Sequence, residues 1–321
     1  MIIDMPKTST TAVDKRLVRL RDEGGAVALG RVLTLVVIAD EADIETAVEA
    51  ANHASREHPC RVLVFASAGP ADAPPQLDAQ IRVGGDAGAS EVVILRAAGP
   101  LLDQPDAVAM PLLLPDAPIV VWWPREAPET PSQHPIGRMA HRRITDSVRS
   151  AHPEAMIRSL AEHYSDGDTD LAWARDTLWR GLLAAAVEQP PFEPVTGVVV
   201  EGEKGHTSLD LLAAWLRAKL RCPTTITHHR GATAITRVTL QRKSGDIVID
   251  RPDGRTATIS QAGAPDRRIS LPIRKLSEAL IEELRRLDPD EVYAEALRTG
   301  LPAIDSDGGS HSSGPHPKDA A

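Results

Sequence analysis

Two apolar strands flanking one amphipathic helix constrain the fold of this chain more than any other feature. Residues 31–39 (RVLTLVVIA) form a nearly continuous apolar run rich in β-branched side chains, which is typical of a strand buried on both faces. A helix with Ile44, Ala47 and Val48 on one side follows, and residues 60–66 (CRVLVFA) form the next strand. A β-α-β order requires a parallel pair joined by a right-handed crossover. We therefore predict an α/β fold whose N-terminal sheet is layered and mostly parallel.

The second half of the chain predicts another α/β domain, in which an antiparallel meander follows one further β-α-β unit. The turn sequences Ser244-Gly245-Asp246 and Pro252-Asp253-Gly254 join three of its strands. We expect strands at residues 79–83, 91–95, 119–123, 195–201, 224–228, 235–242, 246–251, 256–260 and 268–272, and helices at residues 11–21, 169–188 and 208–220. The predicted domains are an N-terminal α/β domain of residues 1–166, a C-terminal α/β domain of residues 167–304, and a disordered tail of residues 305–321, which is almost free of apolar side chains.

Charge and composition exclude several classes of function. The formal net charge of −9 across 321 residues would repel a phosphate backbone, so we expect no nucleic-acid partner. No apolar run approaches the roughly 18 residues of a membrane helix, and MIIDMPKTST at the start lacks a basic-then-apolar signal, so we expect a cytoplasmic protein without a membrane partner. Cys60 opens a buried strand and is expected to be inert, whereas Cys222, beside Pro223 at a helix end, is expected to be more accessible.

The motifs of common catalytic sites are missing. The chain has no G-x-S-x-G elbow, no Walker lysine and no G-x-G-x-x-G, and its histidines lack the spacing of joint metal ligands. The glycine-rich run at residues 83–89 leads into a strand rather than a helix, so a plain turn is the better interpretation. We therefore predict no catalytic residue, no cofactor and no metal site.

Tryptophans and charged residues gather in two clusters that suggest docking surfaces. Along the helix expected at residues 169–188, Leu171, Leu178, Leu182 and Ala185 share one stripe, and Trp173 falls on the opposite side. The clusters either seal the two domains together or contact a partner protein, and the sequence leaves both interpretations open. The candidate partner-interface residues are Trp122, Trp123, Arg142, Arg143, Asp146, Asp168, Asp170, Trp173, Arg175 and Arg180.

Several long motifs resemble one known family, the actinobacterial glucose-6-phosphate dehydrogenase assembly proteins, also called OpcA. The motifs are SREHPCRVLVF from Ser55, LDAQIRVGGDAGASEVVIL from Leu77, PLLLPDAPIVVWWP from Pro111, RRITDS from Arg142, GDTDLAWARDTLWR from Gly167, LLAAWLRAKL from Leu211 and EELRRLDPDEVYAEAL from Glu282. The resemblance extends from about Leu17 to Leu301. It implies a non-catalytic accessory protein that binds glucose-6-phosphate dehydrogenase and promotes its active oligomer in the oxidative pentose phosphate pathway.

One alternative from another class stays open at this point. Arginine forks suit phosphate, so Arg142, Arg143 and the loop at residues 84–88 would then belong to a sugar-phosphate-binding enzyme or sensor. The redox control by cysteines that is associated with cyanobacterial members of the family does not carry over, because Cys60 and Cys222 are the only cysteines here. The sequence names no small-molecule effector.

Overall fold

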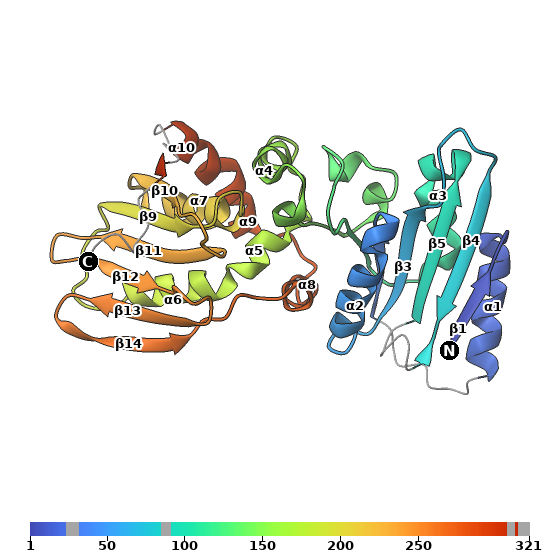
Figure 1. Ribbon diagram of the computed structural model, residues 1–321, viewed down its shortest axis with the longest axis horizontal. Coiled ribbons are helices and arrows are strands. Elements are labelled where there is room, and N and C mark those ends of the chain that lie inside the picture. Colours follow the sequence, from blue (N-terminus) through green and yellow to red (C-terminus); the bar gives the residue numbers. More distant parts are fainter. Residues whose placement is uncertain (24–31, 85–90, 307–311, 314–321) are drawn as a thin grey trace. The chain divides into compact units, whose positions relative to one another are not determined.

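The computed structural model describes residues 1–23, 32–84, 91–306 and 312–313 (Figure 1). The chain divides into two compact units, and each combines separate stretches of sequence. Unit 1 comprises Met1–Arg149, Gly167–Thr169 and Leu276–Pro289, and unit 2 comprises Ser150–Asp166, Asp170–Lys275 and Asp290–Ala321. Residues 85–88 of the predicted loop at residues 84–88, and residues 307–311 and 314–321 of the predicted disordered tail, lie outside the described residues.

The first unit is built on an eight-stranded sheet of order β1-β4-β5-β3-β2-β6-β7-β8. Strands β5, β3, β2, β6 and β7 pair in parallel, and β1 and β4 add two antiparallel pairings at one edge. The strands are β1 (Ile2–Met5), β2 (Leu33–Ile38), β3 (Cys60–Ser67), β4 (Gln76–Arg82), β5 (Glu91–Ala98), β6 (Ile119–Trp122), β7 (Arg142–Thr145) and β8 (Asp168–Asp170). The predicted parallel β-α-β unit is therefore confirmed.

Helices cover both faces of this sheet because its central strands are apolar on both sides (Figure 1). On one face Val13 and Leu17 of α1 (Thr10–Glu23) join a core with Leu63. On the other face α2 (Ile44–Ala54) packs against β3, and α8 (Leu276–Leu284) packs in turn against α2. The short helices of this unit are η1 (Glu41–Asp43), η3 (Gly99–Asp103), α3 (Pro105–Ala109), η4 (Met110–Leu112), η5 (Pro131–Gln133), η6 (Gly137–Met139) and η7 (Ser147–Arg149).

The second unit contains a seven-stranded sheet of order β14-β13-β12-β11-β9-β10-β15. Strands β9 and β10 pair in parallel around α7, and β11 to β14 form the predicted antiparallel meander. The strands are β9 (Gly197–Gly202), β10 (Thr224–His228), β11 (Ile235–Gln241), β12 (Ile247–Asp250), β13 (Thr256–Gln261), β14 (Ala264–Ser270) and β15 (Ser312–Ser313). The fold class predicted from the sequence, two α/β parts with a C-terminal meander, is thus confirmed.

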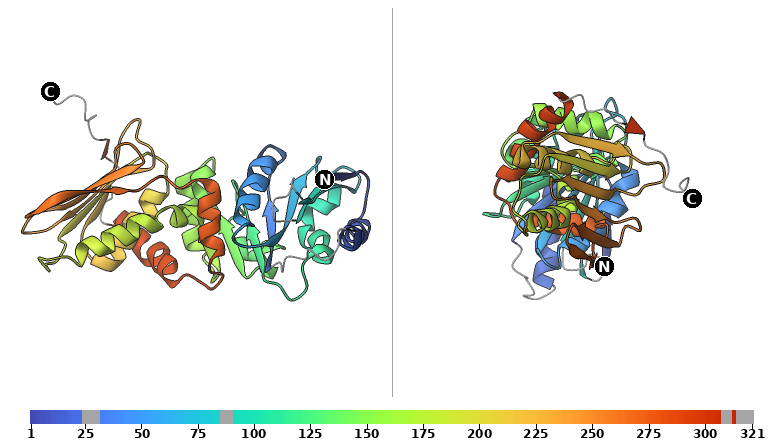
Figure 2. Two further views of the ribbon diagram at one scale, coloured as in Figure 1. Left: turned by 90° about the horizontal axis from the view of Figure 1, so that it is seen from below. Right: turned by 90° about the vertical axis from the view of Figure 1, so that its left-hand side faces the viewer.

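Strands β11, β12 and β13 alternate buried and exposed residues, as expected for a sheet covered on one face. Figure 2 shows the helices of this unit on one side of the sheet. They are α4 (Pro153–Glu162), α5 (Leu171–Arg175), α6 (Thr177–Val187), α7 (Ser208–Leu220), α9 (Glu291–Glu295), the π-helix η8 (Ala296–Gly300) and α10 (Leu301–Ser306).

Three sequence-based expectations are wrong in detail. The helix expected at residues 169–188 begins as strand β8 and is divided at Asp176 into α5 and α6. The inward stripe of α6 is Trp179, Leu183 and Ala186, whereas Leu178 is 39% exposed. Cys222 is only 6% exposed and, like Cys60, is buried, so a helix end beside a proline did not make it accessible.

Candidate functional site

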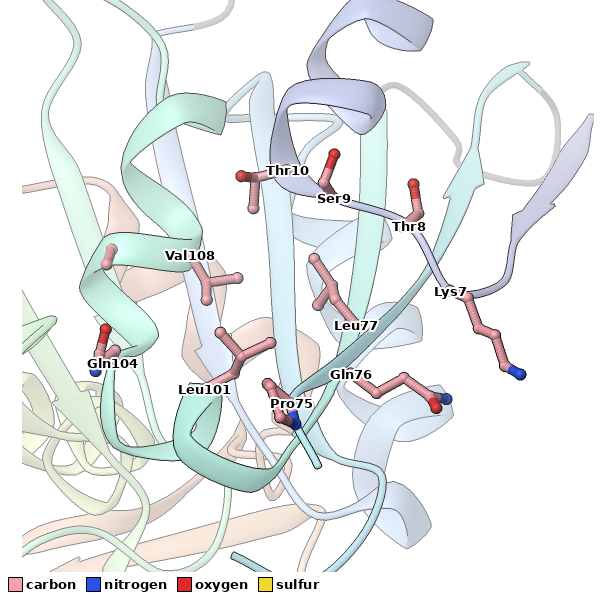
Figure 3. A pocket seen from close by; sticks show the side chains of 11 residues that line it. Lys7, Thr8, Ser9, Thr10, Pro75, Gln76, Leu77, Leu101, Gln104 and Val108 are labelled. Carbon is pink, nitrogen blue, oxygen red and sulfur yellow. The ribbon is translucent and has the colours of Figure 1, made fainter. Parts of the chain in front are cut away.

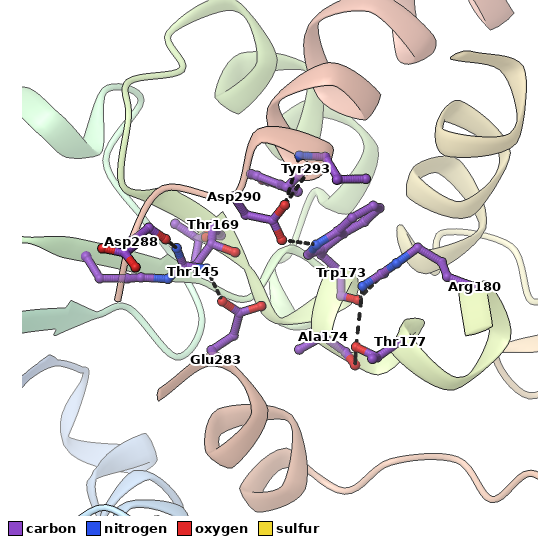
Figure 4. Close-up of polar contacts among 12 residues, drawn as sticks. Thr145, Thr169, Trp173, Ala174, Thr177, Arg180, Glu283, Asp288, Asp290 and Tyr293 are labelled. Carbon is purple, nitrogen blue, oxygen red and sulfur yellow. Dashed lines mark hydrogen bonds and ion pairs between the residues drawn. The ribbon is translucent and has the colours of Figure 1, made fainter. Parts of the chain in front are cut away.

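The two arginines of β7 are buried ion-pair partners in unit 1. Adjacent residues of a strand point to opposite faces, and here Arg142 reaches Glu283 of α8 while Arg143 reaches Asp168 of β8. The Arg142 Nη2 lies 2.6 Å from the Glu283 Oε2, and its Nη1 donates to the Asp288 carbonyl at 2.8 Å (Figure 4). Both guanidinium charges are therefore compensated inside the fold, which removes the basis for a phosphate grip at these two residues.

The tryptophans that end β6 are also part of the interior. Trp122 and Trp123 are both buried, and Trp123 belongs to the core cluster on the α1 face of the sheet. The Trp123 ring meets the ring of His134 edge-on, with centroids 5.5 Å apart, and burial lowers the pKa of His134. The Trp122 indole nitrogen has no hydrogen-bond partner within the described residues. Neither ring is displayed as a docking surface.

The three aspartates among the predicted interface residues are buried as well. Asp168 pairs with Arg143, as described above. Asp170 caps α5, because its Oδ1 accepts from the Ala172 backbone N–H at 2.8 Å. Asp146 is completely buried just after β7. The carboxylates of Asp168 and Asp170 thus stabilise the strand and the helix start in which they lie.

In unit 2, Trp173 is the centre of a polar and aromatic cluster (Figure 4). The Arg180 guanidinium carbon lies 3.4 Å from the centroid of the Trp173 ring, and its Nη1 donates to the Trp173 carbonyl at 2.7 Å. The Trp173 indole N–H donates to Asp290 at 2.9 Å, and Tyr293 lies 5.7 Å away, centroid to centroid. Asp290 also caps α9. This carboxylate, which was not among the predicted residues, therefore fixes both the indole and the start of a helix.

A cavity of about 530 Å³ lies in unit 1 beside the start of α1 (Figure 3). Apolar side chains such as Leu77, Leu101 and Val108 line one part of it, and Ser9 and Thr10 line another. The Ser9 hydroxyl already accepts from the Ala12 N–H at 3.3 Å and caps the helix. The cavity has the volume of a small-molecule site.

A second cavity of unit 1 lies at the carboxyl ends of the parallel strands. The strand order reverses between β2 and β6, which is the place where open α/β sheets bind ligands. The cavity encloses about 190 Å³ and is lined there by Asp40, Asp43, Ser67 and Arg125. Asp43 pairs with Arg125 at 2.8 Å and with Arg149 at 2.9 Å, and these arginines lower the pKa of its carboxyl. Most of the charged side chains around this second cavity therefore form ion pairs with one another.

Among the described residues, no group of three or more His, Cys, Asp and Glu side chains is placed to hold a metal ion. In the same part of the chain, no helix is long and apolar enough to cross a membrane.

Two protein-family descriptions match the chain in sequence order. The N-terminal domain of a glucose-6-phosphate dehydrogenase subunit matches residues 51–162, and the C-terminal domain of such a subunit matches residues 166–297. The chain belongs to the glucose-6-phosphate dehydrogenase assembly (OpcA) family. This membership connects it with the pentose phosphate pathway and so with carbohydrate metabolism.

Other comparisons add little to the family assignment. The search of curated proteins finds no match. A solved structure described as trehalose-6-phosphate from E. coli bound with UDP-2-fluoro glucose is 8% identical, with a TM-score of 0.25. The match covers 61% of this chain and 64% of that chain, so the present chain spans less than two thirds of its length.

Within the OpcA family assignment, the ten predicted interface residues fall into two groups. Eight are buried, and only Arg175 and Arg180 keep partial exposure. The eight buried residues are Trp122, Trp123, Arg142, Arg143, Asp146, Asp168, Asp170 and Trp173. A sequence pattern of tryptophan beside charge does not separate a surface hot spot from a buried network, because both bring an indole N–H to a polar partner.

Proposed function

We propose that this OpcA-family chain is a non-catalytic accessory protein that binds glucose-6-phosphate dehydrogenase in the cytoplasm and promotes its active oligomer. The observation that carries the proposal is the pair of dehydrogenase-subunit domain matches, which follow one another with a gap of only three residues between 162 and 166. The absence of the common catalytic motifs from the sequence agrees with an accessory role.

An accessory protein of this kind acts by differential binding. It raises the population of one oligomer of the enzyme only if it binds that oligomer more tightly than the others. A binding surface that is already rigid loses less conformational entropy when the complex forms. The buried ion pairs of β7 and the Trp173 cluster supply such rigidity within their own units.

We propose that the ten predicted interface residues contribute to binding in two different ways. Arg175 and Arg180 are only half-buried, so we expect these two side chains to contact the dehydrogenase directly. The buried residues act indirectly, through the strands and helix ends that they hold in place. Arg180 is the better candidate for a contact, because its ring-stacked guanidinium is pre-organised by Trp173.

Size-exclusion chromatography and steady-state kinetics with both purified proteins test the proposal. Alone, the chain is expected not to reduce NADP with glucose 6-phosphate. Added at micromolar concentration, it is expected to move the dehydrogenase to a larger species and to change its turnover or apparent substrate affinity. An unchanged elution profile together with unchanged kinetics contradicts the accessory role.

A matched pair of variants tests the contact. Arg180→Ala removes the stacked guanidinium and is expected to weaken the complex about tenfold or more. Arg268→Ala, on the exposed strand β14, removes the same charge and serves as the control. Equal affinity of both variants for the dehydrogenase would remove Arg180 from the interface.

A further inference from the structure

A small cavity in unit 2 lies where strand β9 leads into helix α7. Its lining includes His206 and Ser208, which flank the N-terminus of the 13-residue helix. The loop before the helix depends on two glycines. Gly202 packs where a Cβ would lie 2.1 Å from the Ala234 carbonyl oxygen, and Gly205 has a φ of +76°. A strand, a glycine-bearing loop and a helix N-terminus form an arrangement that favours anions.

Positive charge dominates the lining of this α7 cavity. Arg175, Arg251 and Arg274 contribute three guanidinium groups, and Asp176 contributes the one carboxyl. Burial raises the pKa of Asp176 well above its usual range, although nearby arginines oppose the shift. Burial also lowers the pKa of His206 to about 4, so that its ring is neutral at pH 7.

Three buried side-chain atoms of the residues that line the cavity lack a hydrogen-bond partner. Arg251 is 3% exposed, and two of its nitrogens donate to the carbonyls of Leu271 and Ile235. The Arg251 Nε, the His206 Nδ1 and the Asp176 Oδ2 have no partner within the described part of the chain. Buried polar atoms normally find a partner, and an unsatisfied donor of a charged group is the more costly case. The Arg251 Nε therefore marks a place for an acceptor from outside the chain.

The size of the cavity limits what enters it. It encloses about 10 Å³, which is room for a single atom the size of a water oxygen. Arg175 and Arg274, which also line it, are only half-buried, and the Arg274 Nη1 donates to the Ala174 carbonyl at 2.9 Å. A larger ligand group therefore places only one atom inside the cavity.

We propose that the α7 cavity binds the phosphoryl group of a small molecule, with one oxygen against Arg251 and the others held by Arg175 and Arg274. Several arginines at a helix N-terminus match the geometry and charge of a phosphoryl group better than those of a single carboxylate. The inference concerns unit 2 alone and does not depend on the accessory role proposed above.

The test is a titration of the full chain with inorganic phosphate, followed by isothermal calorimetry and by the imidazole NMR signal of His206. Sodium acetate and sodium chloride at matched ionic strength are the controls. Phosphate is expected to bind saturably and to shift the His206 signal, whereas chloride has no effect. Arg175→Gln and Arg274→Gln are each expected to weaken phosphate binding about tenfold or more, and Arg268→Gln on exposed β14 is expected to bind as the wild type does.

Each other outcome overturns the inference. No saturable binding of phosphate by the wild type at millimolar concentration means that the cavity holds a water molecule only. Equal weakening by Arg268→Gln and by the two cavity variants means unspecific attraction to positive charge. Tighter binding of acetate than of phosphate would indicate a carboxylate site instead. The wild-type titration decides the matter even if a cavity variant fails to fold.

Discussion

At the scale of the residue, Trp173 carries most of the interactions in its cluster. It is 2% exposed, it donates to Asp290, and it stacks beneath Arg180. Truncation to alanine removes the buried ring and leaves Asp290 without its donor, so Trp173→Ala is expected to lower the free energy of unfolding by about 3–5 kcal/mol. Urea unfolding measures this loss.

The exposed neighbour Leu178 provides the control for this prediction. Leu178→Ala is expected to change the free energy of unfolding by no more than about 0.5 kcal/mol, because Leu178 is 39% exposed on α6. An unchanged urea midpoint for Trp173→Ala, combined with loss of binding to the dehydrogenase, would instead place Trp173 in the partner interface.

His206 predicts how stability depends on pH. Its pKa is lowered from 6.5 to about 4 in the folded protein, first of all by burial. As pH falls below 6.5 the unfolded chain takes up a proton that the folded chain does not, so the folded state loses stability until pH reaches about 4. The loss is about 3 kcal/mol at most. Chemical denaturation of the wild type and of His206→Asn between pH 7 and 4 checks it.

The variant is expected to have a flatter pH profile than the wild type. His53→Asn is the matched control, because His53 lies exposed on α2. Parallel profiles for His206→Asn and the wild type would show that His206 takes up its proton equally well in both states.

At the scale of the element, the spacing of apolar residues in the sequence predicts helices and strands most reliably. Helix α7 and strand β10 have the predicted bounds, because a long amphipathic helix and a β-branched strand each have one clear period. Strands β7 and β8 were not predicted, since RRIT and DTD have the composition of polar loops. Their burial depends on ion pairs such as Arg143–Asp168, and partners 25 residues apart leave no local signal.

The same limit applies to the predicted interface residues. Tryptophan beside arginine in the sequence correctly indicated dense clusters, as Trp173 and Arg180 show. Whether such a cluster faces solvent depends on residues far along the chain. Asp290, which bonds to Trp173, lies 117 positions away. The sequence therefore revealed the cluster but not its burial.

The ion pair between Arg142 and Glu283 joins strand β7 to helix α8. We predict how much free energy of unfolding is lost when this pair is broken. Glu283→Leu leaves a buried guanidinium unpaired and is expected to cost about 3–5 kcal/mol of unfolding free energy. The double variant Arg142→Leu/Glu283→Leu is expected to lose clearly less than the sum of the single losses. A double-mutant cycle in guanidinium chloride measures the coupling.

A surface pair supplies the control for this cycle. Arg237 and Asp250 lie 3.1 Å apart, but their side chains are 46% and 38% exposed. Their coupling is expected to stay below about 1 kcal/mol. Equal coupling for the two pairs would mean that burial adds nothing to the interaction of Arg142 with Glu283.

At the scale of the whole molecule, each compact unit combines segments that lie far apart in the sequence. Helix α8 follows the meander of unit 2 in sequence, yet it packs against α2 in unit 1. Helix α8 buries Ala279, Leu280 and Leu284, and helical spacing in a sequence indicates such a face but not the surface that covers it. The domain boundary between residues 166 and 167 stays a prediction, and α8 offers a direct way to test it.

A fragment of residues 1–166 lacks α8, and so it lacks both the helix that covers α2 and the carboxylate that pairs with Arg142. We expect this fragment to unfold at a lower temperature than the full chain and to bind a hydrophobic dye. A synthetic peptide of residues 276–289 is expected to raise the melting temperature of the fragment, because it restores the apolar contact and the ion pair. A peptide carrying Glu283→Leu is the matched control and should restore much less. If the fragment melts at the temperature of the full chain, with or without the peptide, residues 1–166 form an independent domain to whose stability α8 contributes nothing.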